Sequence, residues 1–127
     1  MSTTAVDEKL KKYRTIQEDI QKLFVQKQNA LSQFNENTLV KGEMDLLEED
    51  SKVFKLVGPV LMSVELEESK GNVAKRLEFI EAEIKKADSA IAEKQGEMAT
   101  LGDEIAAEQQ KMQASAASAA REIAADV

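Results

Sequence analysis

The run from Val53 to Val64 constrains this chain most, because it is the one strongly β-forming stretch between two segments of helical character. Nearly every residue in it is apolar and several are β-branched, which favours strands. Gly58-Pro59, which includes the chain's only proline, punctuates the run. We expect two short strands joined by a turn. If the turn is Gly58–Leu61, Pro59 takes its second position, where the fixed φ of proline is favourable. A type I′ turn with Pro59 in a central position is excluded, because proline cannot take a positive φ.

Apolar side chains fall on both faces of each expected strand, since successive residues of a strand point to opposite sides. A lone two-stranded hairpin is marginally stable in water, and its free edges invite pairing with further strands. This chain offers no other strand-forming run, so the additional strands must come from other chains. We therefore predict that the hairpin, at about 53–64, assembles with other subunits through these side chains: Val53, Phe54, Leu56, Val57, Val60, Leu61, Met62 and Val64.

Both flanking segments carry apolar residues at alternating spacings of three and four, which is the pattern of a coiled-coil seam. The first helix is expected at about 7–47 and the second at about 70–113. The seam of the first comprises Tyr13, Ile16, Ile20, Leu23, Lys27, Ala30 and Phe34. The seam of the second comprises Val73, Leu77, Ile80, Ile84, Ala87, Ile91, Lys94, Met98, Leu101, Ile105, Glu108 and Met112.

A sustained seven-residue repeat on two segments joined by a hairpin indicates a long antiparallel two-helix coiled coil. The fold class is therefore mainly α, in one domain, with the chain ends together at one tip and the hairpin at the other end. Residues 1–6 are expected to fray, and the Ala/Ser-rich tail at about 114–127 is expected to be mobile.

Polar residues interrupt the seam at Lys27, Asn37, Lys94 and Glu108. Lys27 and Asn37 either fix the register and the choice of partner or are simply tolerated, and the sequence leaves both interpretations open. Gly96 and Gly102 lie off the seam, where each costs about 1 kcal/mol relative to alanine in a helix. The later part of the second helix is therefore less firmly specified than its beginning.

The composition excludes several kinds of chemistry. The 127 residues include neither Cys nor His, which removes disulfides, thiol nucleophiles, zinc fingers and histidine acid–base catalysis. The sequence has no glycine-rich phosphate loop, and its carboxylates are scattered, so we expect no enzyme, metal site or cofactor. The net charge of −7 disfavours nucleic acid as a ligand. No apolar run has the length of a signal peptide or membrane span, so we expect a soluble intracellular protein.

Four stretches of this sequence resemble the β-type subunits of the prefoldin family: Asn35-Glu36-Asn37, Leu46–Asp50, Val53–Leu61 and Lys75–Ile80. The resemblance covers about residues 8–113. Phe54–Leu61 together with Lys75-Arg76-Leu77 is most similar to the eukaryotic branch called subunit 6. The hairpin run carries this resemblance, whereas the heptads alone would not.

The resemblance implies a hexamer, in which this chain joins two α-type and three further β-type subunits. It also implies that the hairpins form a double β-barrel from which the coiled coils hang. The tips then hold unfolded proteins, actin and tubulin chains among them. These clients pass without ATP to the cytosolic group II chaperonin, which implies a cytoplasmic location.

The apolar residues near the expected tip are then candidates for client binding: Leu10, Tyr13, Leu101, Ile105 and Met112. Each of them can equally be an ordinary seam residue, and client binding requires the tip to open. The alternative function is a structural coiled-coil tether or scaffold subunit that binds no client.

Overall fold

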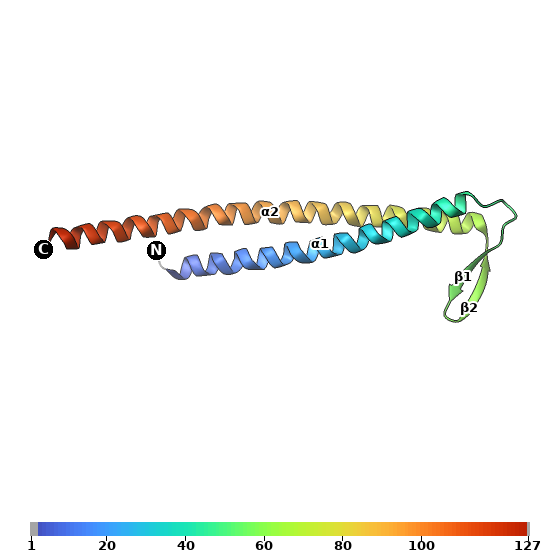
Figure 1. The fold of residues 1–127 in the computed structure, drawn as a ribbon, viewed down its shortest axis with the longest axis horizontal. Helices are drawn as coiled ribbons and strands as arrows, with labels where there is room; N and C mark the ends of the chain where they lie inside the picture. The colour runs from blue at the N-terminus through green and yellow to red at the C-terminus, as the bar shows by residue number, and fades with distance from the viewer. Residues whose placement is uncertain (1–2, 127) are drawn as a thin grey trace. The chain divides into compact units, whose positions relative to one another are not determined.

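A computed structural model describes residues 3–126 of the chain, which form two helices joined by two strands (Figure 1). In chain order these are α1 (Thr3–Asp45), β1 (Val53–Val57), β2 (Val60–Val64) and α2 (Leu66–Ala125). The predicted fold class, mainly helical with one hairpin between two long helices, is confirmed. The hairpin spans residues 53–64 as expected, whereas the bounds of both helices differ from the prediction.

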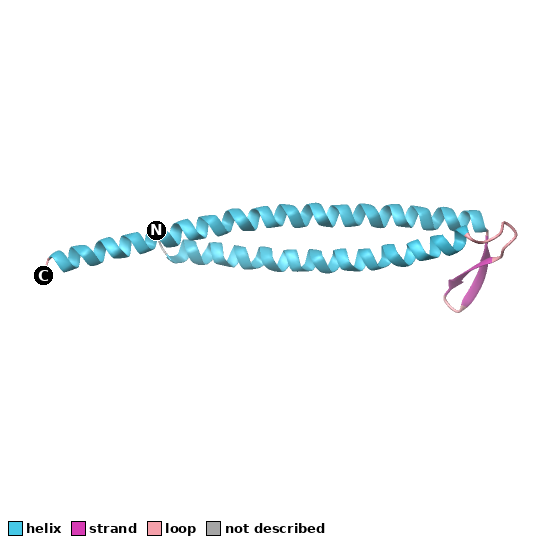
Figure 2. Cartoon of the chain, turned by 45° about the horizontal axis from the view of Figure 1, so that its top comes forward, coloured by secondary structure: helices cyan, strands magenta, loops and turns pink. Residues whose placement is uncertain are grey.

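The chain divides into two compact units, and each helix contributes to both. The hairpin unit is Phe24–Ser89, which contains the end of α1, both strands and the beginning of α2. The terminal unit combines the chain up to Leu23 with the chain from Ala90 onward. Within each unit the two helical segments run antiparallel, and Figure 2 shows the strands of the hairpin unit as a pair that connects them.

The predicted seam is the core of both units. Every seam position predicted for the two helices is buried or half-buried. In the hairpin unit the buried apolar residues are Leu66, Val73, Ile80 and Ala87. In the terminal unit they are Val6, Ile20, Ile91 and Ile105. Burial along a single stripe is what a two-helix coiled coil requires, because each helix offers only one face to its partner.

Both helices begin earlier than predicted, and in each case an apolar residue one heptad upstream explains the difference. Val6 precedes Tyr13 by one repeat and is only 7% exposed, so the helix extends back to Thr3, while the fraying expected for residues 1–6 stays a prediction. Leu66 precedes Val73 by one repeat and is also buried. Glu67 and Glu68 lie in the first turn of α2, where carboxylates interact favourably with the helix dipole.

α2 continues to Ala125, well past the predicted end near residue 113. The stretch after Met112 carries no bulky seam residue, but it is rich in alanine, which has the highest intrinsic helix propensity. All described side chains from Gln113 onward are exposed, so this part of α2 extends beyond its packing against α1. Its mobility stays a prediction.

The turn of the hairpin differs from the prediction by one position. Val57 pairs with Val60, so the two turn residues are Gly58 and Pro59. Gly58 has a φ of 59°, and Pro59 is not among the positive-φ residues. A positive φ at the first central position alone defines a type II′ turn, whose twist matches that of the flanking strands. Pro59 therefore occupies the third position of the turn, not the second, and type I′ is excluded as predicted.

Substitution of Gly58 by alanine should destabilise the hairpin by about 1–2 kcal/mol, because a side chain disfavours the left-handed region. An added Cβ would meet nothing within 4 Å, so the cost is that of backbone conformation and not of a clash. Hydrogen exchange of the hairpin amides measures the effect. Gly42→Ala is the matched control: this site is equally open but lies inside α1, where alanine should stabilise by about 0.5–1 kcal/mol. Equal exchange rates in both variants would contradict the assignment of the turn.

Candidate assembly interface and client-binding site

The register of the hairpin sorts its side chains into two faces. Cross-strand partners lie on the same face of a sheet. One face therefore carries the pairs Val53–Val64, Lys55–Met62 and Val57–Val60. The other face carries Phe54–Ser63 and Leu56–Leu61. Each face thus combines apolar side chains from both strands, as the sequence indicates.

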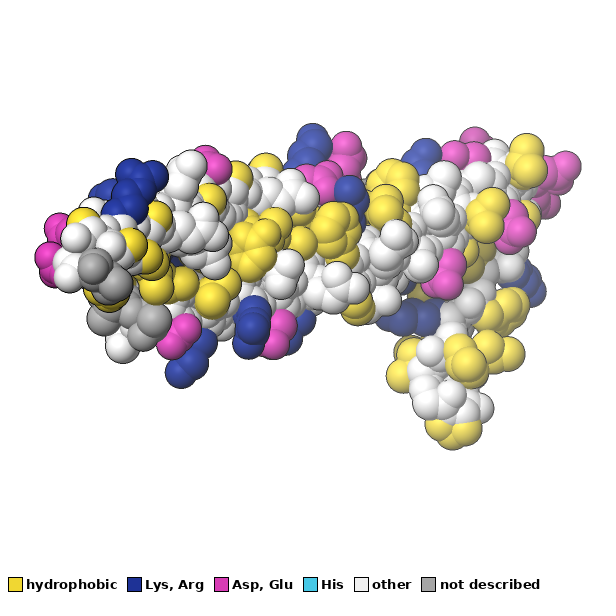
Figure 3. Space-filling model, turned by 60° about the vertical axis from the view of Figure 1, so that its left-hand side comes forward, with side chains coloured by type: hydrophobic (Ala, Val, Ile, Leu, Met, Phe, Trp, Pro, Cys, Tyr) yellow, Lys and Arg dark blue, Asp and Glu magenta, His cyan; other side chains and the backbone are white. Residues whose placement is uncertain are grey.

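Most of these apolar side chains are exposed in the isolated chain. Leu56 and Leu61, which are direct cross-strand partners, are 68% and 65% exposed. Six of the eight predicted assembly residues are strongly exposed: Phe54, Leu56, Val57, Val60, Leu61 and Met62. Val53 and Val64 are half-buried. Figure 3 shows hydrophobic side chains gathered on the projecting hairpin. An exposed apolar patch of this kind marks a protein–protein interface.

The terminal unit brings all five predicted client-binding residues to the seam between its helical segments. Ile105 is buried, while Leu10, Tyr13, Leu101 and Met112 are half-buried. The Tyr13 ring lies against Gly102, where an added Cβ would be 3.7 Å from its Cε2 atom. In this conformation, therefore, none of the five has a fully exposed side chain.

Two shallow pockets nevertheless open beside these residues. Met112 lines one of them together with Val6, Glu108 and Ser115. Leu101 lines the other together with Ile16. These pockets leave the margin of the seam accessible without complete separation of the helices.

Each charged seam residue has an oppositely charged partner on the facing helix. In the hairpin unit, Lys27 Nζ lies 2.7 Å from Asp88 Oδ1. In the terminal unit, Lys94 Nζ lies 3.8 Å from Asp19 Oδ2. Such pairs constrain register, because a one-residue shift would separate the charges. The structure thus favours the register-fixing interpretation of Lys27.

Asn37 behaves differently from Lys27. Its Nδ2 atom donates a hydrogen bond of 2.7 Å to the Gln33 carbonyl, one turn earlier on α1. That bond is internal to one helix and favours the interpretation of Asn37 as a tolerated polar residue.

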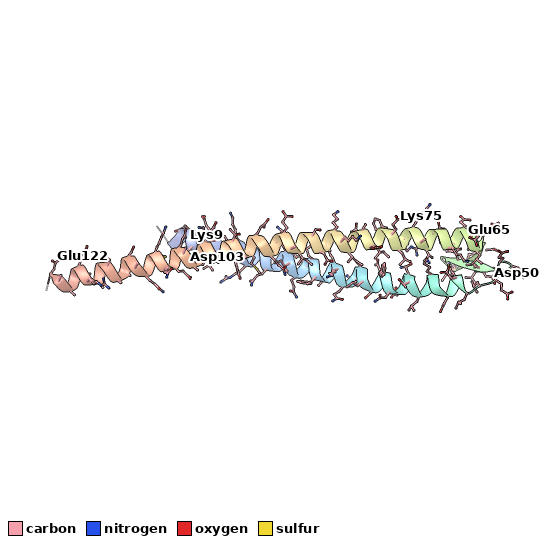
Figure 4. The ribbon with its side chains drawn as sticks, turned by 90° about the horizontal axis from the view of Figure 1, so that it is seen from above. Lys9, Asp50, Glu65, Lys75, Asp103 and Glu122 are labelled. Atoms are coloured by element: carbon pink, nitrogen blue, oxygen red, sulfur yellow. The ribbon has the colours of Figure 1, made fainter. Side chains whose placement is uncertain are left out.

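Glu108, the third charged seam residue, pairs with Lys9, which the sequence did not single out. Lys9 Nζ donates to Glu108 Oε1 at 2.8 Å and lies 3.5 Å from Glu104 Oε2. Figure 4 labels Lys9 where α1 lies beside the part of α2 that includes Asp103. Glu108 Oε2 is buried without a hydrogen-bond partner among residues 3–126. The sequence did contain one indication of this pair: a charged residue at a seam position is favourable only when an oppositely charged residue lies on the facing helix.

The hydrogen bond to Glu108 raises the pKa of Lys9 above its ordinary value of 10.5; partial desolvation opposes this shift, and the charges of Glu108 and Glu104 add to it. The pKa of Lys9 is therefore higher in the folded state than in the unfolded state. The pair contributes its full stabilisation at pH values below the unfolded-state pKa, and this contribution is lost as the pH rises through the folded-state pKa. We expect the contribution of this pair to be constant between pH 6 and 9 and to decline only above the ordinary lysine pKa of about 10.5, as the pH rises through the raised pKa of Lys9.

Replacing Lys9 by methionine should accelerate hydrogen exchange in the terminal unit at neutral pH, because the part-buried Glu108 carboxylate loses its cation. The charge-swapped variant Lys9→Glu/Glu108→Lys should recover most of the protection. Exchange in the hairpin unit serves as the internal control. Equal protection in the wild-type chain and in Lys9→Met would show that the pair has no such role.

Within residues 3–126, no helix has a stretch long and apolar enough to cross a membrane. Among the same residues, no three acidic side chains come together in an arrangement that could hold a metal ion.

Residues 7–112 match the sequence profile of the family described as prefoldin subunit. The chain belongs to the prefoldin family. The match spans both helical seams and the hairpin, so it covers the two surfaces described above. The resemblance of this sequence to the prefoldin family is thereby confirmed.

Curated prefoldin relatives align over most of their length. The chain is 37% identical over 115 residues to the probable prefoldin subunit 6 of Caenorhabditis elegans, covering 91% of each chain. It is 43% identical over 94 residues to prefoldin subunit 6 of Saccharomyces cerevisiae, covering 74% of this chain and 82% of the relative. It is 38% identical over 104 residues to human prefoldin subunit 6, covering 82% of this chain and 81% of the relative.

The prefoldin fold is also present in a solved structure. The crystal structure of the prefoldin beta subunit from Thermococcus strain KS-1 superposes with a TM-score of 0.74 at 19% identity, covering 80% of this chain and 89% of that one. At this identity the likeness concerns the fold alone. Together with the family match, it makes this chain a prefoldin chaperone subunit that assembles with other prefoldin subunits.

Proposed function

We propose that this chain is a β-type subunit of a hexameric prefoldin, which captures unfolded proteins without ATP and delivers them to the cytosolic group II chaperonin. Its hairpin joins those of two α-type and three further β-type subunits in an inter-subunit β-barrel. The observation that carries this proposal is the exposure of six large apolar side chains on a two-stranded hairpin. Closing the hairpin into a barrel pairs its free edges and buries the apolar side chains that face the barrel interior.

Client capture belongs to the terminal unit in this proposal. Charged residues replace apolar layers there at Lys94 and Glu108, so the seam is weaker than an all-apolar one. Met112 borders an open pocket, and methionine adapts readily to varied apolar partners. Opening of this end exposes Leu10, Tyr13, Leu101, Ile105 and Met112 to unfolded chains such as those of actin and tubulin. Each contact is weak, and several subunits acting together supply the avidity.

The experiment reconstitutes the complex from all its subunits and follows aggregation of a denatured protein in the absence of nucleotide. The native mass of the same sample reports the hexamer. Two complexes are compared: one with the full chain, and one in which residues 1–16 and 98–127 are removed so that the hairpin unit remains intact. We expect both to assemble and the truncated complex to suppress aggregation less. Unchanged suppression would contradict a client-binding role for the terminal unit of this chain.

The alternative, a structural tether without clients, draws support from the burial of Ile105 and the half-burial of the other four candidates. Transfer of a labelled denatured actin to the chaperonin distinguishes the two functions. A tether predicts a hexamer that neither retains actin nor changes its rate of arrival at the chaperonin. Such a result would favour the tether.

A further inference from the structure

A groove of about 220 Å³ runs along β1 in the hairpin unit, between the strand and the helices. Val53, Phe54 and Lys55 of β1 line it together with Val64 of β2. Val53, Lys55 and Val64 share one face of the hairpin, so the groove lies between that face and the helices. β1 pairs only with β2 within the described residues, so the backbone groups on its other edge are free to pair with another strand, whose side chains on that face reach the groove.

The helical wall of this groove is partly apolar and exposed. Val40 and Met44 of α1 and Arg76 of α2 contribute to it. Phe79 follows Arg76 by three residues and so lies on the same side of α2, one turn further along. It is 66% exposed, although the next residue, Ile80, is buried in the seam. Large exposed aromatic residues of this kind are enriched in protein interfaces.

The charges around the groove define the chemistry of its occupant. Lys55 and Arg76 are exposed and form no ion pair with any of residues 3–126, while Glu68 is the single carboxylate in the lining. This balance favours an occupant that brings a carboxylate. The volume is below the roughly 300–1,000 Å³ typical of sites for small organic ligands, which disfavours a small-molecule role.

We propose that the interface of this subunit extends from the hairpin onto the helices, where the groove receives side chains of a strand from a neighbouring prefoldin subunit's hairpin. The strand pairs with the free edge of β1 and covers Val40 and Phe79, while an acidic residue on it meets Arg76 and Lys55. The groove is continuous with the hairpin surface already assigned to assembly, and this continuity identifies the occupant. This inference rests on the proposed hexamer and adds a helical surface that distinguishes one neighbour from another.

The test places a photo-crosslinking amino acid at position 79 in the fully reconstituted complex. The matched control is position 39, because Leu39 is 70% exposed in the same unit and does not line the groove. Leu39 follows the groove residue Asn37 by two positions and therefore lies on another side of α1. We expect the adducts from position 79 to map to a neighbouring subunit's hairpin and those from position 39 to miss it. Adducts from position 79 to a client, to another segment or to no protein at all, in a sample that is hexameric, would overturn the inference.

A competition experiment supplies an independent readout. Tagged Phe79→Glu or Leu39→Glu is mixed with an equal amount of the wild-type chain during reconstitution, and incorporation is quantified by native mass. We expect Phe79→Glu to be incorporated at least tenfold less than wild type and Leu39→Glu to be incorporated equally, with unchanged helical circular dichroism in both isolated variants. Equal incorporation of Phe79→Glu would overturn the inference. Failure of the wild-type chain itself to form a hexamer would instead contradict the proposed function.

Discussion

Replacing Leu56 and Leu61 together by aspartate should abolish entry of this subunit into the prefoldin complex and leave its helices intact. The two side chains are exposed cross-strand partners, so the isolated chain loses little packing when they are removed. In a closed barrel the same positions face other chains, and an unpaired carboxylate buried there costs several kcal/mol. Two aspartates directly opposite each other also repel. Native mass spectrometry of the reconstituted mixture should show free variant and no complex that contains it.

The control for this experiment adds the same charge elsewhere. Ser115→Asp/Ser118→Asp places two carboxylates on the exposed final part of α2, and this variant should assemble normally. If the hairpin variant entered the complex as readily as this control, the hairpin would not be the assembly surface. Loss of client capture by the hairpin variant is expected only as a consequence of lost assembly.

Replacing Ile80 by alanine should destabilise the isolated chain by about 2–5 kcal/mol, the usual cost of deleting a buried aliphatic side chain. Ile80 is 5% exposed and lies on the seam of the hairpin unit. Phe79→Ala, one residue away on the same helix, should change stability by at most about 0.5 kcal/mol, because Phe79 is exposed. Thermal unfolding followed by helical circular dichroism measures both. If both variants lost the same stability, burial in the seam would not be its source, because the two adjacent positions lie in the same turn of the same helix.

Heptad spacing predicted the core of this protein because a two-helix coiled coil has only one place to bury apolar side chains. The positions from Tyr13 to Phe34 and from Val73 to Met112 could therefore be assigned without a structure. The helix ends were less predictable. Val6 and Leu66 extend the repeat by one heptad each, but an isolated apolar residue beside polar neighbours is a weak signal.

The type of turn and the charged partners across the two helices could be identified only from the structure. Gly58-Pro59 is compatible with more than one pairing register, and only the pairing of Val57 with Val60 identifies a type II′ turn. Lys9, Asp19 and Asp88 are ordinary charged residues in the sequence, and their roles follow from which residues of the opposite helix they meet. Phe79 also gave no signal, because an aromatic residue beside a seam position resembles a core residue until its exposure is known.

The sequence separation of the ion pair between Lys9 and Glu108 has a consequence for folding kinetics. These residues are 99 positions apart, whereas Val57 and Val60 meet across two turn residues. Direct closure of so long a loop is entropically costly, so the antiparallel helices pair most easily by zipping outward from the hairpin. The terminal unit is then the last part of the subunit to fold and the first to separate on unfolding. In the proposed function, unfolded chains therefore meet the segment of this subunit whose own folded state is completed last.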